Sequence, residues 1–153
     1  MYKLYKRDGR VLNYHEVWEE DGSVIEHFGI AGTRGSFHRH PIPAGADEDK
    51  IMETLLEPAA KSGFEEIAED ELIKLHVVVP RPDIVGDADL EKRHEIEDRM
   101  DDLLGETGVG HCDGGSMQEK TMEIFCFVAD EEIAKGVIRA DFDDEDLIGL
   151  RRK

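Results

Sequence analysis

Histidine is the residue type in this chain best able to hold a metal ion, and the chain has seven of them. A hairpin turning about Gly32-Thr33 would place His27 across from His38, with His40 two residues further on the same face. A turn at Asp21-Gly22 would place a carboxylate across from the first of these histidines. The spacing therefore predicts imidazoles gathered on one face of a small sheet.

Three imidazoles and one carboxylate on one sheet face are the ligand set of a zinc or iron site. His15 is expected on the opposite face and is excluded. A shift of one residue in either hairpin would disperse the set, because alternate residues of a strand point to opposite faces. The predicted metal ligands are Glu16, His27, His38 and His40.

The cysteines offer a second kind of chemistry. Cys112 follows His111, but adjacent side chains of a strand point to opposite faces, so the two cannot form a nucleophile–base dyad. Two cysteines are too few for a disulfide framework. If Cys112 and Cys126 lie on the two strands of a hairpin turning near Met117, the expected register does not place them opposite one another. We expect two reduced thiols.

Two loop-like segments resemble known ligand loops only in part. Asp113-Gly114-Gly115-Ser116 lacks the Lys-Ser/Thr and the helix of a phosphate-binding loop, and a hairpin turn is expected there instead. The acidic runs 101–102 and 143–146 lack the glycine and the spacing of a calcium loop. Both runs are expected to be solvated faces, and together they could receive a basic partner.

The formal net charge is -18, and it is unevenly distributed. Residues 1–45 hold six Lys and Arg against six Asp and Glu, so the remaining residues carry the whole excess. Such a field repels phosphate backbones and favours basic partners, although solubility alone also explains it. We expect a basic protein partner rather than nucleic acid, with contacts from Asp101, Asp102, Asp143, Asp144, Glu145 and Asp146.

Neither a membrane span nor a secretory signal is expected. The longest apolar stretches, such as 75–79 and 124–129, are far shorter than the roughly 20 residues that a span requires. The basic residues near the N-terminus are not followed by an apolar core. We expect a cytoplasmic protein with no membrane contact and no cofactor, whose oligomeric state the sequence leaves open.

The first half is expected to form a small antiparallel sheet followed by a helix. Strands are predicted over 11–19, 24–29 and 36–41, because Asp8-Gly9 and Asp21-Gly22 favour tight hairpins. A helix over 46–61 would carry its apolar stripe on Ile51, Leu55, Leu56 and Ala59. Pro58 is expected to kink or shorten that helix, and Gly63 to end it.

The second half is expected to follow the order β-α-β-β-α-β. A continuous apolar strand over 73–80 indicates a central position in a sheet. A helix capped by Asp87 or Asp89 is followed by strands over 109–113 and 122–129, a helix capped by Asp130, and an edge strand over 147–151. The first helix is expected to place one side in the core, formed by Leu90, Ile96, Met100, Leu103 and Leu104. This order is that of the ferredoxin-like split arrangement, in an α+β chain.

Residues 18–35 and the later Ser62-Gly63-Phe64 resemble the core of a WGR domain. The resemblance covers about residues 1–67 and implies an antiparallel sheet with one helix. In that family a Trp and an Arg contribute to nucleic acid contact. Here Phe28 and Ile30 stand at those positions, so the fold is carried over and the DNA binding is not. The alternative, a WGR-type nucleic acid module, would use Arg34, His38, Arg39 and His40.

The second half is similar to small bacterial ferredoxin-like domains with a Gly-x-x-Asp-Gly hairpin, here 110–115. Together the two resemblances predict a WGR-like module over 1–67 and a ferredoxin-like module over 72–153. The expected function is non-enzymatic binding of a basic protein, in the manner of bacterial immunity proteins or acidic adaptors. A metal-dependent enzyme at the histidine face is a third alternative.

Overall fold

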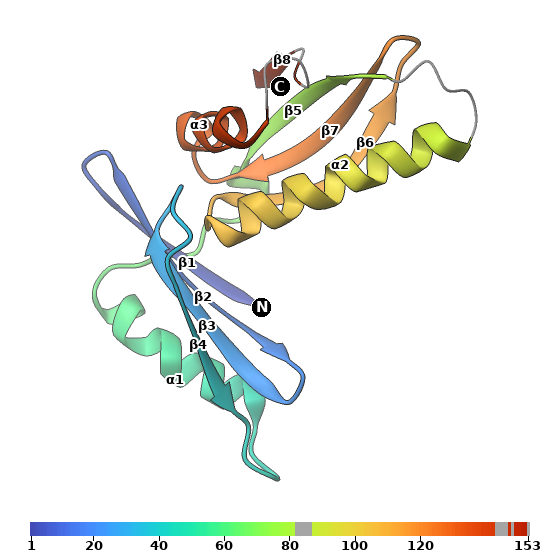
Figure 1. The fold of residues 1–153 in the computed structure, drawn as a ribbon. Coiled ribbons are helices and arrows are strands. Elements are labelled where there is room, and N and C mark those ends of the chain that lie inside the picture. Colours follow the sequence, from blue (N-terminus) through green and yellow to red (C-terminus); the bar gives the residue numbers. More distant parts are fainter. Residues whose placement is uncertain (82–86, 143–146, 148, 153) are drawn as a thin grey trace. The chain divides into compact units, whose positions relative to one another are not determined.

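The computed structural model describes residues 1–81, 87–142, 147 and 149–152. The described chain is α+β, with two four-stranded antiparallel sheets and three α-helices. It divides into two compact units, residues 1–68 and residues 69–153. Each unit contains one of the sheets (Figure 1).

The first unit is a meander of four strands. The strands β1 (Tyr2–Asp8), β2 (Val11–Glu20), β3 (Ser23–Ile30) and β4 (Ser36–Pro41) pair in chain order. The tight hairpin predicted at Asp21-Gly22 is confirmed, and the one predicted at Asp8-Gly9 turns one residue later, at Gly9-Arg10. Asp21 and Gly22 have φ of 49° and 74°, the positive values that a primed two-residue turn needs.

One helix packs on this sheet. α1 (Glu48–Lys61) is capped by Asp47, whose carboxylate accepts from the amide of Asp49. Its buried side joins Val17 and Val24 of the sheet in a core with Met52 and Leu56. Pro58 lies inside the helix, which continues to Lys61, so the expected shortening is wrong.

The second unit has the strand order β6-β7-β5-β8. Its elements are β5 (Ile73–Pro80), α2 (Asp87–Glu106), β6 (Gly110–Met117), β7 (Thr121–Val128), α3 (Glu131–Asp141) and β8 (Gly149–Arg152). β5 pairs with β7 and β8, so its predicted central position is confirmed. α2 contacts β6, β7 and α3 (Figure 1).

The core of the second unit is formed by β5, buried continuously from Leu75 to Val79, and by alternate residues of β7. Leu75 and Val77 of β5 are fully buried, as are Met100 and Leu104 of α2. Leu90, expected in this core, is 45% exposed. It lies in the first turn of α2, ahead of the buried stretch.

The glycines of the second hairpin lie within a strand and not in its turn. Gly114 and Gly115 belong to β6, and the chain reverses after Met117, which pairs with Met122. The expected turn at 113–116 is therefore wrong. A Cβ on Gly115 would lie 2.3 Å from the carbonyl oxygen of Glu123, so only glycine allows this approach of the two strands.

Candidate functional site

The register between β3 and β4 decides which histidines share a face of the first sheet. His27 lies opposite Phe37, and Glu26 lies opposite His38. The predicted pairing of His27 with His38 is therefore wrong by one residue. An odd number of residues joins the paired ends of the two strands, so the hairpin is centred on Gly32 itself and not on the bond that follows it.

This register separates the four predicted ligands into two groups. Glu16 lies opposite His27, as predicted, and both occupy one face of the sheet. His38 and His40 point to the other face, because neighbouring residues of a strand alternate. His15, which the prediction excluded, lies on this second face. The structure does not bring the predicted set together.

Glu16 and His27, the enclosed pair, are joined by a short hydrogen bond. His27 Nδ1 lies 2.6 Å from Glu16 Oε1, and the two side chains are 1% and 5% exposed. His27 Nε2 lies 2.6 Å from the carbonyl oxygen of Arg34. The Tyr14 hydroxyl lies 2.9 Å from the same Nε2, so both ring nitrogens of His27 have protein partners. Neither ring nitrogen is open to an incoming metal ion.

Other side chains complete the enclosure of this pair. The hydroxyl of Tyr14 donates to the carbonyl oxygens of Thr33 and Arg34, at 3.1 and 3.0 Å. The Phe37 ring stacks on the His27 ring, with centroids 3.8 Å apart. Lys3 Nζ lies 3.3 Å from Glu16 Oε2. Burial lowers the pKa of the Lys3 ammonium, and the charge of Glu16 opposes part of that lowering.

The other face carries a second group, the open cluster of His15, Glu26, His38 and His40. Glu26 Oε2 accepts from His15 Nε2 at 2.8 Å, and Glu26 Oε1 accepts from His40 Nε2 at 3.0 Å. His38 Nδ1 lies 3.8 Å from the same Oε1. The Glu26 side chain is 12% exposed, whereas those of His38 and His40 are 58% and 37% exposed.

This second group has the donor atoms of a metal site. One ligand atom each from Glu26, His38 and His40 lies within 4.8 Å of the others. Sequence reasoning missed Glu26 and rejected His15. The predicted turn at Asp21-Gly22 already placed these two residues on one face. What the sequence did not reveal is whether the next connection has an odd or an even number of residues, which decides which histidines of β4 share that face.

The four residues of the nucleic acid alternative do not form one surface. Arg39 points to the face opposite His38 and His40, and its guanidinium bonds Glu20 at 2.9 Å. Arg34 lies in the connection between β3 and β4. Beside Arg39, a hollow of about 280 Å³ is bordered by the aromatic rings of Trp18 and Phe37, but also by the carboxylate of Glu20.

The acidic residues predicted to contact a partner do not all have the same surroundings. Asp102 is exposed on α2. Asp101 is exposed as well, but its Oδ1 accepts from the amide of Cys112 at 2.7 Å. Glu97, one turn earlier, accepts from the amide of Gly114 at 3.1 Å. The remaining predicted residues, Asp143, Asp144, Glu145 and Asp146, lie outside the described residues.

The two thiols lie side by side. Cys112 and Cys126 are direct cross-strand partners with Sγ atoms 2.9 Å apart, so the prediction that they are not opposite is wrong. A bulge between Cys112 and Gly115 adds one residue to β6 and shifts the register. The hydrogen bond to Cys126, and then burial, raise the pKa of the Cys112 thiol. A thiol in this state is a weak nucleophile.

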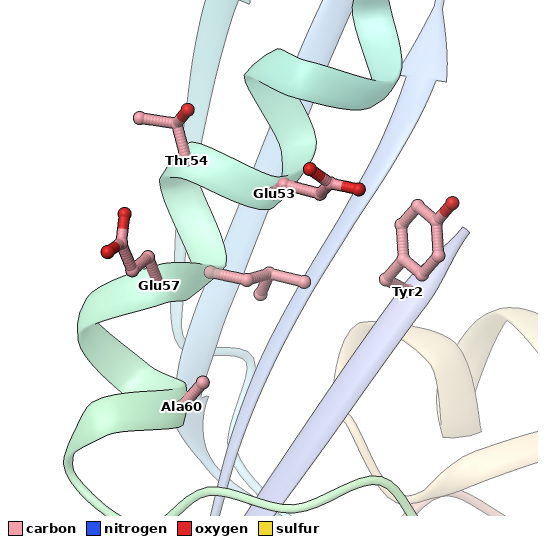
Figure 2. Close-up of a pocket in the computed structure, with 6 residues that line it drawn as sticks. Tyr2, Glu53, Thr54, Glu57 and Ala60 are labelled. Atoms are coloured by element: carbon pink, nitrogen blue, oxygen red, sulfur yellow. The ribbon is translucent and has the colours of Figure 1, made fainter.

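A larger hollow, of about 410 Å³, lies between β1 and α1. Tyr2, Glu53, Thr54, Leu56, Glu57 and Ala60 line it. Figure 2 shows the Glu53 carboxylate directed toward the Tyr2 ring. The Thr54 hydroxyl donates to the carbonyl oxygen of Lys50 at 2.7 Å. Its lining side chains include neither a histidine nor a cysteine.

Among the described residues, no helix is long and apolar enough to cross a membrane. Comparison with protein-family models, curated proteins and solved structures finds no match to this chain.

Proposed function

We propose that this chain is a non-enzymatic binding protein, which docks a basic segment of a partner protein on the exposed side of α2. The observation that carries the proposal is a row of carboxylates on that helix, here called the carboxylate stripe. Its members are exposed and follow one another at spacings of three or four residues, so they lie on one side of the helix. They are Glu91, Glu95, Asp98, Asp102 and Glu106.

The carboxylate stripe has few cationic partners. Glu95 lies 3.6 Å from Lys92 in an exposed pair. Within the described part of the chain, no other Lys or Arg lies at ion-pair distance from the stripe. The unit that contains α2 holds 24 Asp and Glu against 11 Lys and Arg. A basic segment would meet negative charge with little competition.

The stripe is also unfavourable for the helix itself. Like charges at spacings of three or four residues destabilise a helix by about 0.2–0.5 kcal/mol per pair. Acids near the C-terminal end oppose the helix dipole, and the last turn of α2 holds no basic residue to compensate. A basic partner would relieve both effects. Relief of this strain favours a binding role over solubility alone.

The two sides of α2 therefore have different roles in this proposal. Glu97 and Asp101 bond amides of β6 and hold the helix against the sheet. Asp98 and Asp102, one position later, point away and remain exposed. The first pair would fix the helix, and the second pair would meet the partner.

We propose a ferredoxin-like fold for the second unit. The strand order β6-β7-β5-β8, antiparallel throughout, supports this, as does the element order. For the first unit we propose a WGR-like fold, supported by the four-stranded meander followed by α1. We place the protein in the cytoplasm, with a role of the immunity-protein or adaptor kind. The raised pKa of the Cys112 thiol supports binding rather than catalysis.

The test uses the full chain and a short lysine- and arginine-rich peptide as the probe. Amide chemical shifts during titration should move first along α2. Glu95→Lys, Asp98→Lys and Asp102→Lys combined should weaken binding about tenfold or more, which corresponds to about 1.4 kcal/mol. The matched control is Asp49→Lys, Glu53→Lys and Glu57→Lys, the same charge change on exposed positions of α1.

Equal weakening by both triple variants would show that the peptide responds only to net charge, and the proposal would fail. Amide chemical-shift changes distributed over acidic residues of both units would likewise show a response to net charge alone. Retention of the wild-type affinity by the α2 variant would place the contact elsewhere.

A further inference from the structure

The open cluster presents one carboxylate to three imidazoles. Glu26 bonds His15 through Oε2 and His40 through Oε1, and His38 Nδ1 lies 3.8 Å from that same Oε1. Each of these imidazoles has a second ring nitrogen, so each can rotate or change tautomer to present a lone pair. The cluster thus contains donor atoms that its hydrogen bonds do not exhaust.

The spacing of these donor atoms suits a small transition-metal ion. In a tetrahedral zinc site the metal–ligand distances are about 2.0–2.2 Å, which places neighbouring ligand atoms about 3.4 Å apart. Here the separations from Glu26 Oε1 are 3.0 Å to His40 Nε2 and 3.8 Å to His38 Nδ1. Ligand atoms of all three residues lie within 4.8 Å of one another. Small side-chain movements would bring them onto one ion.

The two strands hold these side chains in place before any ion arrives. Glu26 is directly opposite His38, and His40 is two residues further along β4 on the same face. The carboxylate is 12% exposed, while the two imidazoles are 58% and 37% exposed. The anionic ligand is therefore fixed within the sheet, and the histidines leave access from solvent.

His15 is placed to orient the Glu26 carboxylate through the oxygen that does not face His38 and His40. It bonds Oε2 and leaves Oε1 toward His38 and His40. Its ring also packs beside that of Phe28, with centroids 5.3 Å apart, which restricts its orientation. Hydrogen bonds to a ligating carboxylate orient it and commonly change metal affinity by about 10–100-fold.

We propose that Glu26, His38 and His40 bind a divalent transition-metal ion, Zn²⁺, with His15 as the positioning residue for the carboxylate. Three protein ligands leave a fourth coordination position for water or for a group from a bound molecule. The site lies in the first unit and is independent of the docking proposed for α2. It differs from the set predicted from sequence, because Glu26 replaces the enclosed Glu16 and His27.

The test is calorimetric titration of the full, chelator-treated protein with zinc chloride alone. We expect one ion per chain. Glu26→Gln, His38→Ala and His40→Ala should each abolish binding or weaken it by more than tenfold, and His15→Ala should weaken it by about 10–100-fold. His111→Ala, at an exposed histidine of the other unit, should leave it unchanged.

The paired thiols are the main competing site, so Cys112→Ser with Cys126→Ser is the second control. Zinc binding should survive in this double variant. Its loss would assign the metal to the cysteines and overturn the proposal. So would the absence of binding by the wild-type protein, or unchanged affinity in the three ligand variants.

A measurement on the wild-type chain tests the same assignment without depending on whether the ligand variants fold. Side-chain imidazole nitrogen resonances of the wild-type protein should shift on zinc addition for His38 and His40, and not for His27. A shift of the His27 resonances with those of His38 and His40 unmoved would refute the assignment. This result does not depend on the peptide titration, so either proposal can fail while the other stands.

Discussion

The enclosed pair and the open cluster are built from the same two residue types on opposite faces of one sheet. In the enclosed pair, both ring nitrogens of His27 meet protein groups, and the Phe37 ring stacks on the buried imidazole. In the open cluster, one carboxylate serves three imidazoles, two of which reach solvent. The first arrangement can only hold the fold together, whereas the second has capacity for a ligand.

The difference shows that residue type alone does not define a site. Glu26 and His27 are neighbours in β3 and point to opposite faces. What separates them is which side chains lie around each one. Three experiments on the protein without metal test whether this contrast is real.

The largest expected effect is from Glu16→Ala. Removing this carboxylate leaves His27 Nδ1 buried without its acceptor, and Lys3 without its partner. Breaking a buried pair in this way costs roughly 3–5 kcal/mol of unfolding free energy. Urea denaturation of the full chain, followed by Trp18 fluorescence in the first unit, measures it.

Glu20→Ala is the matched control, because Glu20 lies on the same strand and face as Glu16. Its pair with Arg39 is about half exposed on both sides. Such pairs contribute about 0.2–1 kcal/mol. If the two substitutions cost the same, the enclosed pair does not stabilise the fold as described.

The next effect is a loss of stability in alkali. Burial, and then the nearby Glu16, raise the pKa values of Tyr5 and Tyr14 above the ordinary value of 10.0. Above about pH 10 the unfolded chain releases these protons while the folded chain retains them. The folded state then binds more protons, so its stability falls as pH rises, by up to about 1.4 kcal/mol per pH unit for each tyrosine.

Lys3 acts in the opposite direction. Its lowered pKa means that the folded chain binds fewer protons than the unfolded chain below pH 10.5, so this residue adds stability as pH rises to that value. Thermal unfolding across pH 9–12 should still show a net decline. Tyr5→Phe should flatten the decline, with Tyr2→Phe, at an exposed position of the same strand, as control. An equal slope in wild type and Tyr5→Phe would contradict the assignment.

The smallest effect should come from the open cluster. Without metal, His40→Ala removes one partly exposed contact with Glu26, and a loss within about 0.2–1 kcal/mol is expected. The same urea denaturation measures it. A cost comparable to that of Glu16→Ala would mean that the open cluster is a structural support, and the contrast between the two faces would disappear.

The elements were predictable where local chemistry decides them. Asp21-Gly22 fixes its hairpin because both residues adopt positive φ. The apolar run of β5 indicates a strand buried on both sides. α1 follows from its apolar stripe, although Pro58, close to its C-terminal end, is tolerated there.

The relative positions of distant residues were less predictable. The separation of His27 from His38 depends on one residue in the loop centred on Gly32. Whether this loop has an odd or an even number of residues depends on how the chain closes over Tyr14. The approach of the cysteines depends on a bulge, which composition does not reveal. In both places a shift of a single residue exchanges the two faces of a strand.

The bonds from α2 to β6 have a consequence for how the protein behaves among copies of itself. β6 is the outer strand of its sheet, and the unpaired amides of such a strand are a template on which another chain can add. Here the carboxylates of Asp101 and Glu97 already occupy the amides of Cys112 and Gly114. An incoming strand would have to displace both carboxylates and bring its own backbone close to a strongly negative helix. At this edge of the sheet, α2 therefore hinders strand exchange and aggregation.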